Sequence, residues 1–158
     1  MQTGGTLVWR ITRQLYAERA FDGEGARLYG GRWNRPGEAV VYTSETLSLA
    51  ALEYFVQLDP DTAPDDLVAV AAELPPGLAV RSLAPADLPA GWRSYPALEA
   101  LQELGTAWVR AGETAALSVP SAVIPHERNL LLNPAHPLLT GLRVLPPEPF
   151  GFDPRVWK

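Results

Sequence analysis

The stretch Tyr29-Gly30-Gly31-Arg32-Trp33-Asn34 is the most distinctive local pattern in this chain of 158 residues. Two adjacent glycines open backbone conformations that other residues avoid, and they leave room for a ligand to approach closely. Arg32 follows with a planar fork of donors suited to phosphate or carboxylate, and Trp33 can stack on a flat ring. This composition is typical of a site wall, or else of a Gly-Gly hairpin with a solvated arginine and a core tryptophan.

Short strands and tight turns are expected on both sides of this stretch. Apolar and β-branched runs predict strands at 6–11, 39–43, 67–74, 78–83, 115–119, 121–124, 129–132 and 141–145. Helical spacing predicts one helix from an N-cap at Ser44 to about Leu58, and a second over 97–111 that Gly112 ends. Residues 12–27 read as a loop or a short helix. We therefore expect a single domain over residues 1–158 with an α+β fold of mostly antiparallel strands and two main helices.

Glu53 occupies an unusual place on the first predicted helix. One apolar face includes Leu47 and Tyr54, and a second carries Leu49, Leu52 and Val56. The helix is therefore expected to be covered on two sides. Glu53 would then lie in a narrow polar slot, where a carboxylate must be paired or functional. The alternative is that the polar strip faces water and Glu53 is an ordinary solvated side chain.

The composition excludes several kinds of site. The chain has no cysteine, so disulfides, thiol catalysis and thiolate-bound metals are excluded. His126 and His136 are the only histidines, and their spacing makes a poor metal site, so no metal is expected. Residues 1–35 hold six arginines against three acidic residues, whereas the rest holds seven basic and fifteen acidic groups. This distribution suits a small anionic ligand better than nucleic acid, unless the arginines are simply scattered on the surface.

The chain also lacks the patterns of membrane and export sequences. Its start, Met1-Gln2-Thr3-Gly4-Gly5, has no basic segment followed by an apolar one. No apolar run approaches the roughly 18 residues that span a bilayer. We therefore expect a cytoplasmic protein that does not contact a membrane.

Three landmarks follow one another in a telling order. They are Gly-Gly-Arg32-Trp-Asn, then Val-Tyr42-Thr-Ser before the helix with Leu-Glu53, and then Val-Pro-Ser121-Ala-Val with Asn129-Leu-Leu-Leu-Asn-Pro-Ala-His-Pro. This order resembles the RES-domain family, the toxin half of Xre–RES toxin–antitoxin pairs, and the likeness extends from Trp9 to about His136. The family is named for an Arg, a Glu and a Ser. Ser121 fits the serine of the pattern better than Ser118.

The resemblance implies an ADP-ribosyltransferase-like fold and a type II toxin. Family members cleave NAD⁺ at the nicotinamide–ribose bond, by hydrolysis or phosphorolysis, and so deplete cellular NAD⁺. Others transfer ADP-ribose to a protein target, and a non-catalytic nucleotide-binding or interaction module remains an alternative. The implied partner is an Xre-type antitoxin that blocks the active site, within a complex in which the toxin could also be a homodimer. Direct nucleic-acid binding is not expected.

The chemistry gives these residues roles. A single carboxylate, Glu53, would stabilise the positive charge that builds on the ribose. Arg32 would hold the pyrophosphate, and Tyr42 would stack on the cationic nicotinamide ring. These three are the expected catalytic residues. The NAD⁺-binding set that we expect is Arg10, Arg32, Trp33, Tyr42, Ser121 and Asn129, with Ser121 bonding either the ribose or Glu53. The structural alternative is that Tyr42 and Trp33 are core residues and that Ser121 and Asn129 belong to turns.

Overall fold

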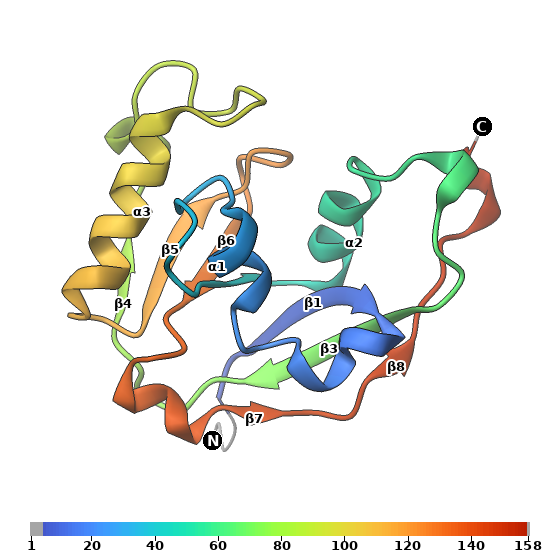
Figure 1. The fold of residues 1–158 in the computed structure, drawn as a ribbon, viewed down its shortest axis with the longest axis horizontal. Coiled ribbons are helices and arrows are strands. Elements are labelled where there is room, and N and C mark those ends of the chain that lie inside the picture. The colour runs from blue at the N-terminus through green and yellow to red at the C-terminus, as the bar shows by residue number, and fades with distance from the viewer. Residues whose placement is uncertain (1–4, 158) are drawn as a thin grey trace.

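A computed structural model describes residues 5–157 (Figure 1). The strands are β1 (Leu7–Arg13), β2 (Val41–Ser44), β3 (Leu67–Glu73), β4 (Val80–Ser82), β5 (Ala116–Pro120), β6 (Arg128–Leu132), β7 (Arg143–Val144) and β8 (Glu148–Pro149). The α-helices are α1 (Glu24–Tyr29), α2 (Leu47–Phe55) and α3 (Glu99–Ala111). Short 3-10 helices lie at Gln14–Arg19, Pro60–Thr62, Pro85–Asp87, Pro137–Gly141 and Pro154–Trp157. The N-terminal residues 1–4, on which most of the export expectation rests, lie outside the described residues.

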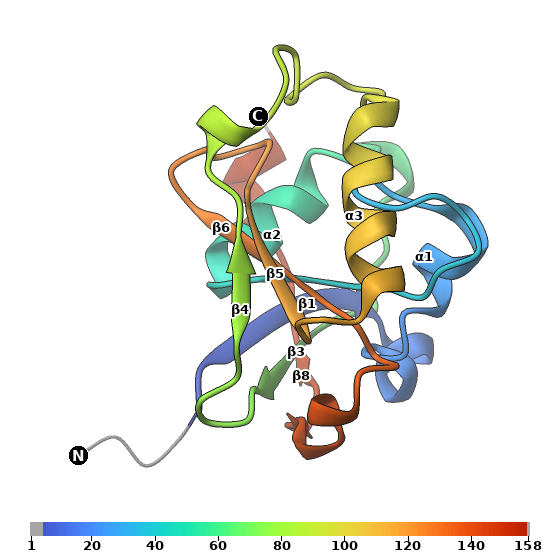
Figure 2. The same ribbon diagram turned by 90° about the vertical axis from the view of Figure 1, so that its left-hand side faces the viewer.

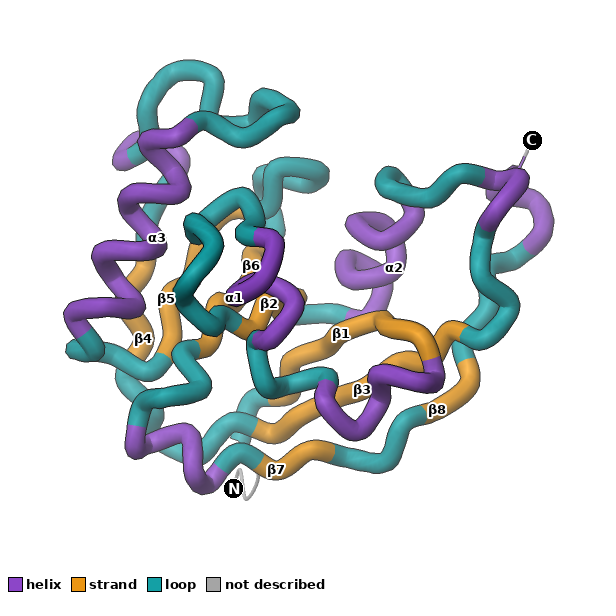
Figure 3. Tube along the Cα trace, in the orientation of Figure 1, coloured by secondary structure: helices purple, strands orange, loops and turns teal. Residues whose placement is uncertain are grey.

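All of these strands belong to one sheet. Its order is β4-β5-β6-β2-β1-β3-β7, and β8 also pairs with β3. The neighbouring strands are antiparallel except for β4 and β5, which are parallel. The expected α+β fold with a mostly antiparallel sheet is thus confirmed. Figure 3 shows how short the strands are compared with the loops that join them.

Both long helices pack on the same face of the sheet. Because successive residues of a strand point to opposite faces, Leu117, Val119 and Leu131 share one face, and they form a core cluster with Leu101 and Trp108 of α3. Helix α2 packs in a second cluster, through Ala50, against Ile11 of β1. Figure 1 shows α2 and α3 standing apart above the sheet, and Figure 2 shows α3 alongside β5.

The opposite face of the sheet is closed by apolar side chains. Val8, Val41, Ala72, Ala116 and Leu132 are all at most 1% exposed there. Burying a side chain of the size of valine or leucine stabilises the fold by about 1.5–3 kcal/mol, so this face is a continuous source of stability. No helix among residues 5–157 has the length and apolarity to cross a bilayer.

The first predicted helix differs from α2 in where it starts and in how one of its faces is covered. Thr46, not Ser44, is the N-cap, and its hydroxyl accepts a hydrogen bond from the Leu49 backbone N–H. Ser44 is instead the last residue of β2, because it pairs with Asn129 of β6 and so remains part of the sheet. The second apolar face is covered only in part, since Leu49 is 2% exposed but Leu52 and Val56 are 37% and 57% exposed.

The other differences concern short elements. The strand predicted at 121–124 is a turn, because the Ser121 hydroxyl accepts from the backbone N–H groups of Val123 and Ile124. The final predicted strand, 141–145, is reduced to Arg143–Val144, and β8 was not predicted. The second helix does end at Gly112, which has a positive φ of 63°.

Candidate functional site

Glu53 is the centre of a cluster of polar side chains. Its Oε1 accepts hydrogen bonds from the Ser44 hydroxyl at 2.9 Å and from Nδ2 of Asn129 at 2.8 Å. Its Oε2 accepts from the Ser121 hydroxyl at 2.7 Å. Glu53 is therefore paired, as one interpretation of the sequence predicted, and the alternative of an ordinary solvated side chain is wrong. These partners are neutral donors, and no ion pair of Glu53 is formed within residues 5–157.

The sheet brings these four residues together. Ser44 pairs with Asn129 across β2 and β6, and Asn129 also pairs with Val119 on β5. Ser121 follows immediately after β5, where the chain turns back toward β6. Glu53 comes from α2, which starts just after β2 and packs on the same face. Three strand ends and one helix thus meet at the carboxylate.

The four residues differ in whether a ligand can still reach their side chains. The single hydroxyl hydrogen of Ser121 goes to Glu53, and its oxygen accepts from Val123 and Ile124, so no bonding capacity remains. Ser121 is 0% exposed and Ser44 is 3% exposed, whereas Glu53 and Asn129 are only partly buried. Ser121 and Ser44 are therefore buried supports, and a ligand can reach only Glu53 and Asn129.

Arg32 lies on the same side of the molecule as Glu53. Its Nη1 donates to the backbone carbonyls of Trp92 and Ser94, at 3.0 and 2.9 Å. Within the described residues its Nε and Nη2 have no protein acceptor, so three N–H donors remain for a ligand. Burial lowers the pKa of Arg32 below its ordinary value, and the negative charge of Glu53 acts on it in the opposite direction.

The turn that carries Arg32 is fixed by Tyr42. The Tyr42 hydroxyl donates to Oδ1 of Asn34 at 2.6 Å and accepts from the Trp33 backbone N–H at 2.9 Å. Gly31 has no side chain because a Cβ there would lie 2.6 Å from that hydroxyl oxygen. Burial raises the pKa of Tyr42 well above its ordinary value, so the phenol stays neutral. The space at Gly31 is thus filled by Tyr42, and was wrongly expected to admit a ligand.

Trp33 and Asn34 hold the same turn from inside. Trp33 is 2% exposed and lies in the core cluster beneath α3, so it has no surface to offer a ligand. Its backbone touches α3 so closely that a Cβ at Gly105 would lie 1.8 Å from the Trp33 carbonyl oxygen. The fully buried Asn34 donates through Nδ2 to the carbonyl of Ala26 at 2.9 Å. Trp33 is therefore a core residue, and the prediction that its side chain forms a wall of the binding site is wrong.

One loop contacts both the turn that carries Arg32 and the turn that follows Ser121. Arg32 holds this loop, residues 91–95, through the carbonyls of Trp92 and Ser94. From the same loop, Arg93 Nε donates to the carbonyl of Ala122, in the turn that follows Ser121, at 2.8 Å. The loop therefore spans from the arginine side of the site to the glutamate side.

Two other predicted or alternative site residues lie elsewhere. Arg10 alternates with Trp9, the partner of Ser44, and so points to the face of the sheet opposite Glu53. Its Nη1 donates to the Tyr42 carbonyl at 2.7 Å, its Nε is buried without a partner, and burial lowers its pKa. Ser118 accepts from Arg128 Nε at 3.0 Å and does not contact Glu53.

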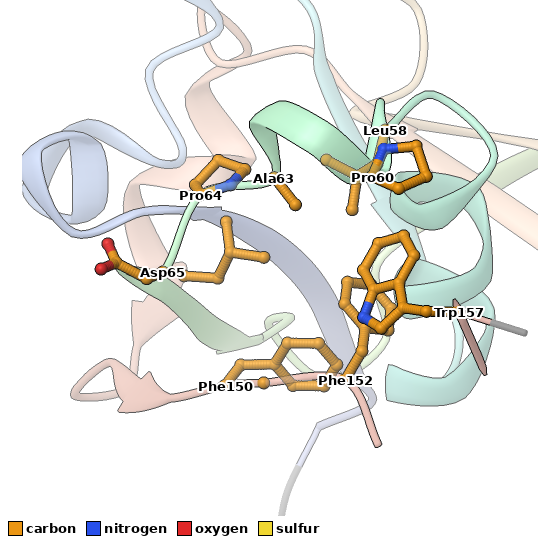
Figure 4. Close-up of a pocket in the computed structure, with 10 residues that line it drawn as sticks. Leu58, Pro60, Ala63, Pro64, Asp65, Phe150, Phe152 and Trp157 are labelled. Atoms are coloured by element: carbon orange, nitrogen blue, oxygen red, sulfur yellow. The ribbon is translucent and has the colours of Figure 1, made fainter. Parts of the chain in front are cut away.

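The two hollows described for the chain lie away from Glu53. One, of about 300 Å³, lies between the chain that follows α2 and the C-terminal segment, with Leu58, Pro60, Phe152 and Trp157 in its wall (Figure 4). The other, of about 310 Å³, lies between β4 and α3 beside Trp108. Residues 5–157 contain no group of three His, Asp or Glu side chains placed to hold a metal ion.

Two members of the site were missed in the sequence. Ser44 was read as a helix cap, and Arg93 was not singled out. A signal existed for Ser44, because it lies two residues after Tyr42 and must share its face of the strand. No local pattern distinguishes Arg93, whose acceptors are backbone carbonyls far along the chain.

Comparison with known proteins identifies the family. The family model described as RES domain matches residues 7–153. The chain belongs to the RES family. A protein named Toxin Res from Yersinia enterocolitica serotype O:8 / biotype 1B (strain NCTC 13174 / 8081) is 36% identical over 95% of this chain and 99% of its own length. One from Sphingobium sp. (strain YBL2), named Prs ADP-ribosylating toxin, is 39% identical over 96% of both chains.

A solved structure supports the fold of this RES chain. It is a chain from the crystal structure of the M. tuberculosis MbcT-MbcA toxin-antitoxin complex, with a TM-score of 0.73 and 20% identity. The match covers 95% of this chain and 86% of the other. This likeness agrees with the expected mixed fold of a mostly antiparallel sheet with helices, and the RES chain is similar to proteins named as toxins.

Proposed function

We propose that this RES protein is the toxin of a toxin–antitoxin pair and that it cleaves NAD⁺ at the bond between nicotinamide and ribose. The observation that carries the proposal is the Glu53 carboxylate, held by Ser44, Asn129 and Ser121 and still partly exposed. Three fixed donors orient the carboxylate before the substrate arrives, and electrostatic stabilisation depends on such preorganisation.

The chemistry needs one carboxylate. As the glycosidic bond of NAD⁺ breaks, positive charge develops on the ribose, and a fixed anion lowers the energy of that transition state. Ordinary glycosidases need a second carboxyl group to protonate the leaving oxygen. Nicotinamide leaves as a neutral molecule from a cationic nitrogen, so no such acid is required. Glu53 is the residue assigned to this step.

The remaining parts of NAD⁺ are assigned by charge and shape. The N–H groups of Arg32 that the loop 91–95 leaves unused would bind the pyrophosphate. The partly buried ring of Tyr42, which lies two residues before Ser44 on β2 and binds the turn that carries Arg32, would stack on the nicotinamide ring. Ser121 supports Glu53 rather than binding ribose. No metal takes part in this proposal.

Release of nicotinamide tests the reaction. Purified protein is incubated with NAD⁺, with and without inorganic phosphate, and free nicotinamide is measured together with the second product. ADP-ribose as product identifies water as the acceptor, and its phosphorylated form identifies phosphate. Failure to release nicotinamide under both conditions would refute the proposal.

A second candidate reaction is transfer of ADP-ribose to a protein. It is favoured by the name of the Sphingobium relative, Prs ADP-ribosylating toxin, which is similar along 96% of this chain. Labelled NAD⁺ added to a cell extract distinguishes the two reactions. Transfer leaves the label on a protein band, whereas hydrolysis or phosphorolysis leaves it in a small molecule.

The proposal also includes a partner and a place of action. We propose a cytoplasmic toxin whose Arg32 and Glu53 are blocked by a cognate antitoxin of the Xre type. The matched chain of the M. tuberculosis structure comes from a toxin–antitoxin complex, which supports a partner of this kind. Co-expression of the neighbouring gene should stop nicotinamide release, and a co-purified complex that leaves Arg32 open would contradict the blocking contact.

Growth of cells that express variants of the protein tests the non-catalytic alternative. If the protein were only an interaction module, expression of the Glu53→Gln variant would arrest growth as the wild type does. The catalytic proposal expects normal growth with this variant at equal protein level, and it expects growth arrest with the matched Glu103→Gln variant. Glu103 lies on α3 in an exposed ion pair with Arg35, away from the site.

A further inference from the structure

Of the four described side chains in the Glu53 cluster, Glu53 and Asn129 keep a free acceptor for a ligand, and every donor is already used within the cluster. In Asn129, Nδ2 lies 2.8 Å from Glu53 Oε1 and 3.3 Å from the Thr43 carbonyl oxygen. Neither of these atoms can donate when the carboxylate is ionised, so the amide nitrogen must face them and the amide oxygen must face away. The orientation of the Asn129 amide is therefore dictated by its neighbours.

The Asn129 oxygen is left without a protein donor. Among the side-chain atoms of residues 5–157, only Arg10 Nε is both buried and without a hydrogen-bond partner. Asn129 Oδ1 accepts no hydrogen bond from the described residues, so it must reach the surface. Because Oδ1 and Nδ2 are bonded to the same carbon, this exposed oxygen lies a few ångströms from the Glu53 carboxylate.

Glu53 itself has one acceptor position left. Each carboxylate oxygen has two lone pairs. Oε1 uses both, for Ser44 and Asn129, whereas Oε2 uses one for Ser121. Ser44 and Ser121 are buried and cannot contribute a further group. A ligand that enters this end of the site meets two neighbouring acceptors, Glu53 Oε2 and Asn129 Oδ1.

The opposite end of the site has the reverse character. The N–H groups of Arg32 that remain are donors only, which suits the acceptor-only oxygens of a pyrophosphate. A ligand matched to both ends carries phosphate oxygens at one end and a pair of neighbouring hydroxyl groups at the other. A ribose with both of its hydroxyls has this second feature.

We propose that Asn129 binds substrate directly, by accepting through Oδ1 a hydrogen bond from one hydroxyl of the nicotinamide-bearing ribose while Glu53 Oε2 accepts from the other. This assignment rests on the proposed NAD⁺ cleavage. It gives Asn129 two roles, since Nδ2 donates a hydrogen bond to Glu53 while Oδ1 accepts one from a ribose hydroxyl. A ligand that lacks the second hydroxyl leaves Oδ1 with only water.

Analogues of NAD⁺ test the assignment. Three substrates are compared: NAD⁺ and the two analogues that lack the 2′- or the 3′-hydroxyl of the nicotinamide ribose. Each is assayed for nicotinamide release with the wild type, Asn129→Ala and Ser44→Ala. Ser44 is the matched control, because it also donates to Oε1 of Glu53 but is buried. Its hydroxyl accepts from Asn129 Nδ2 at 3.1 Å, and in Ser44→Ala that nitrogen keeps its other two acceptors, Glu53 Oε1 and the Thr43 carbonyl. Differences in bond lability among the substrates cancel when each analogue is compared across the proteins.

The expected result is specific to one hydroxyl. In the wild type and in Ser44→Ala, removing that hydroxyl should lower kcat/KM about tenfold, the usual size of one hydrogen bond. In Asn129→Ala the same removal should cost less than about twofold, because its partner is already gone. Asn129→Ala should lose activity on NAD⁺ through both kcat and KM, whereas Ser44→Ala should lose mainly kcat.

Two outcomes overturn the assignment and are distinguishable from each other. If the wild type cleaves NAD⁺ but both analogues suffer the same penalty in Asn129→Ala as in the wild type, Asn129 only positions Glu53. If the wild type releases no nicotinamide from NAD⁺ itself, the proposed function fails and this assignment falls with it.

Discussion

Helix α2 contributes to two regions that differ in almost every property. On one side, Glu53 gathers three polar side chains from separate strands around a shallow, partly exposed carboxylate. At its C-terminal end, Phe55 packs on Phe152 and Trp157, with ring centroids 5.5 and 5.1 Å apart, beside a hollow of about 300 Å³. The hollow is lined mainly by apolar side chains, whereas the Glu53 region has an oriented carboxylate. The proposed site of this RES protein therefore rests on the oriented charge and not on a cavity.

The comparison is tested most severely at Glu53. Replacing it with glutamine keeps the size but removes the charge, so nicotinamide release should fall by about 100- to 1,000-fold, as when one transition-state donor is lost. The matched Glu103→Gln variant should keep wild-type activity. Steady-state assays and circular dichroism of both proteins make the measurement. Near-normal activity in a folded Glu53→Gln variant would mean that Glu53 does not carry out the reaction.

The next largest effect is expected at the buried support of Glu53. Ser121→Ala removes a hydrogen bond to a charged group, so kcat should fall by about 10- to 100-fold with little change in KM. Ser118→Ala, on the other face of β5, should leave kcat unchanged. This pair decides between the two serines that the sequence left open. A strong loss in Ser118→Ala alone would contradict the assignment of Ser121.

The aromatic region should show the opposite behaviour. Phe152→Ala removes ring contacts with Phe55, Phe150 and Trp157, so the free energy of unfolding should fall by about 2 kcal/mol. Below the unfolding temperature, kcat/KM should stay within about twofold of the wild type. Chemical denaturation and nicotinamide assays on one preparation test both statements. A large loss of activity without loss of stability would make the hollow part of the site.

The smallest effect is expected at the edge of the aromatic region, where Arg13 pairs with Asp66. Arg13 lowers the pKa of the Asp66 carboxyl through a hydrogen bond at 3.0 Å. A lowered folded-state pKa stabilises the protein above the unfolded value of about 3.9, and this stability is lost as pH falls through the folded value. Arg13→Ala should thus be slightly less stable than the wild type at pH 7.

Denaturation curves at two pH values complete that test. As the pH falls below the unfolded value of about 3.9 and through the lower folded value, the difference in stability between wild type and Arg13→Ala should shrink, because Asp66 becomes protonated in both proteins. A difference that is equal at both pH values would mean that Arg13 stabilises the fold by packing rather than by charge. Nicotinamide release should not change, since Arg13 lies at the end of β1 away from Glu53.

The sequence predicted the fold where local patterns were strong. Apolar and β-branched runs predicted strands that overlap β1, β3 and β6, and helical spacing with a glycine cap predicted the helix that ends at Gly112. Three ordered motifs, at Arg32, Glu53 and Ser121, led to the family. The failures came where tertiary contacts override local signals. Ser44 looks like a cap, but its pairing with Asn129 keeps it in the sheet.

The site was only partly predictable for the same reason. A slot around Glu53 could be inferred from the two apolar faces of its helix, but its three donors come from segments that only the sheet register brings together. Trp33 and Arg10 were expected at the ligand because their side chains suit it. Their positions are decided instead by packing under α3 and by strand alternation, which composition does not reveal.

The contacts of the loop 91–95 have a consequence for how this region can vary. Among residues 5–157, Arg32 and Arg93 donate to main-chain oxygens only, those of Trp92, Ser94, Ala122 and Val123. Such oxygens are present whichever amino acid occupies the acceptor positions. Point changes at 94 and 122 should therefore be tolerated, whereas deleting or inserting one residue would shift every acceptor out of reach. Loop length, rather than side-chain identity, is the property that selection would preserve here.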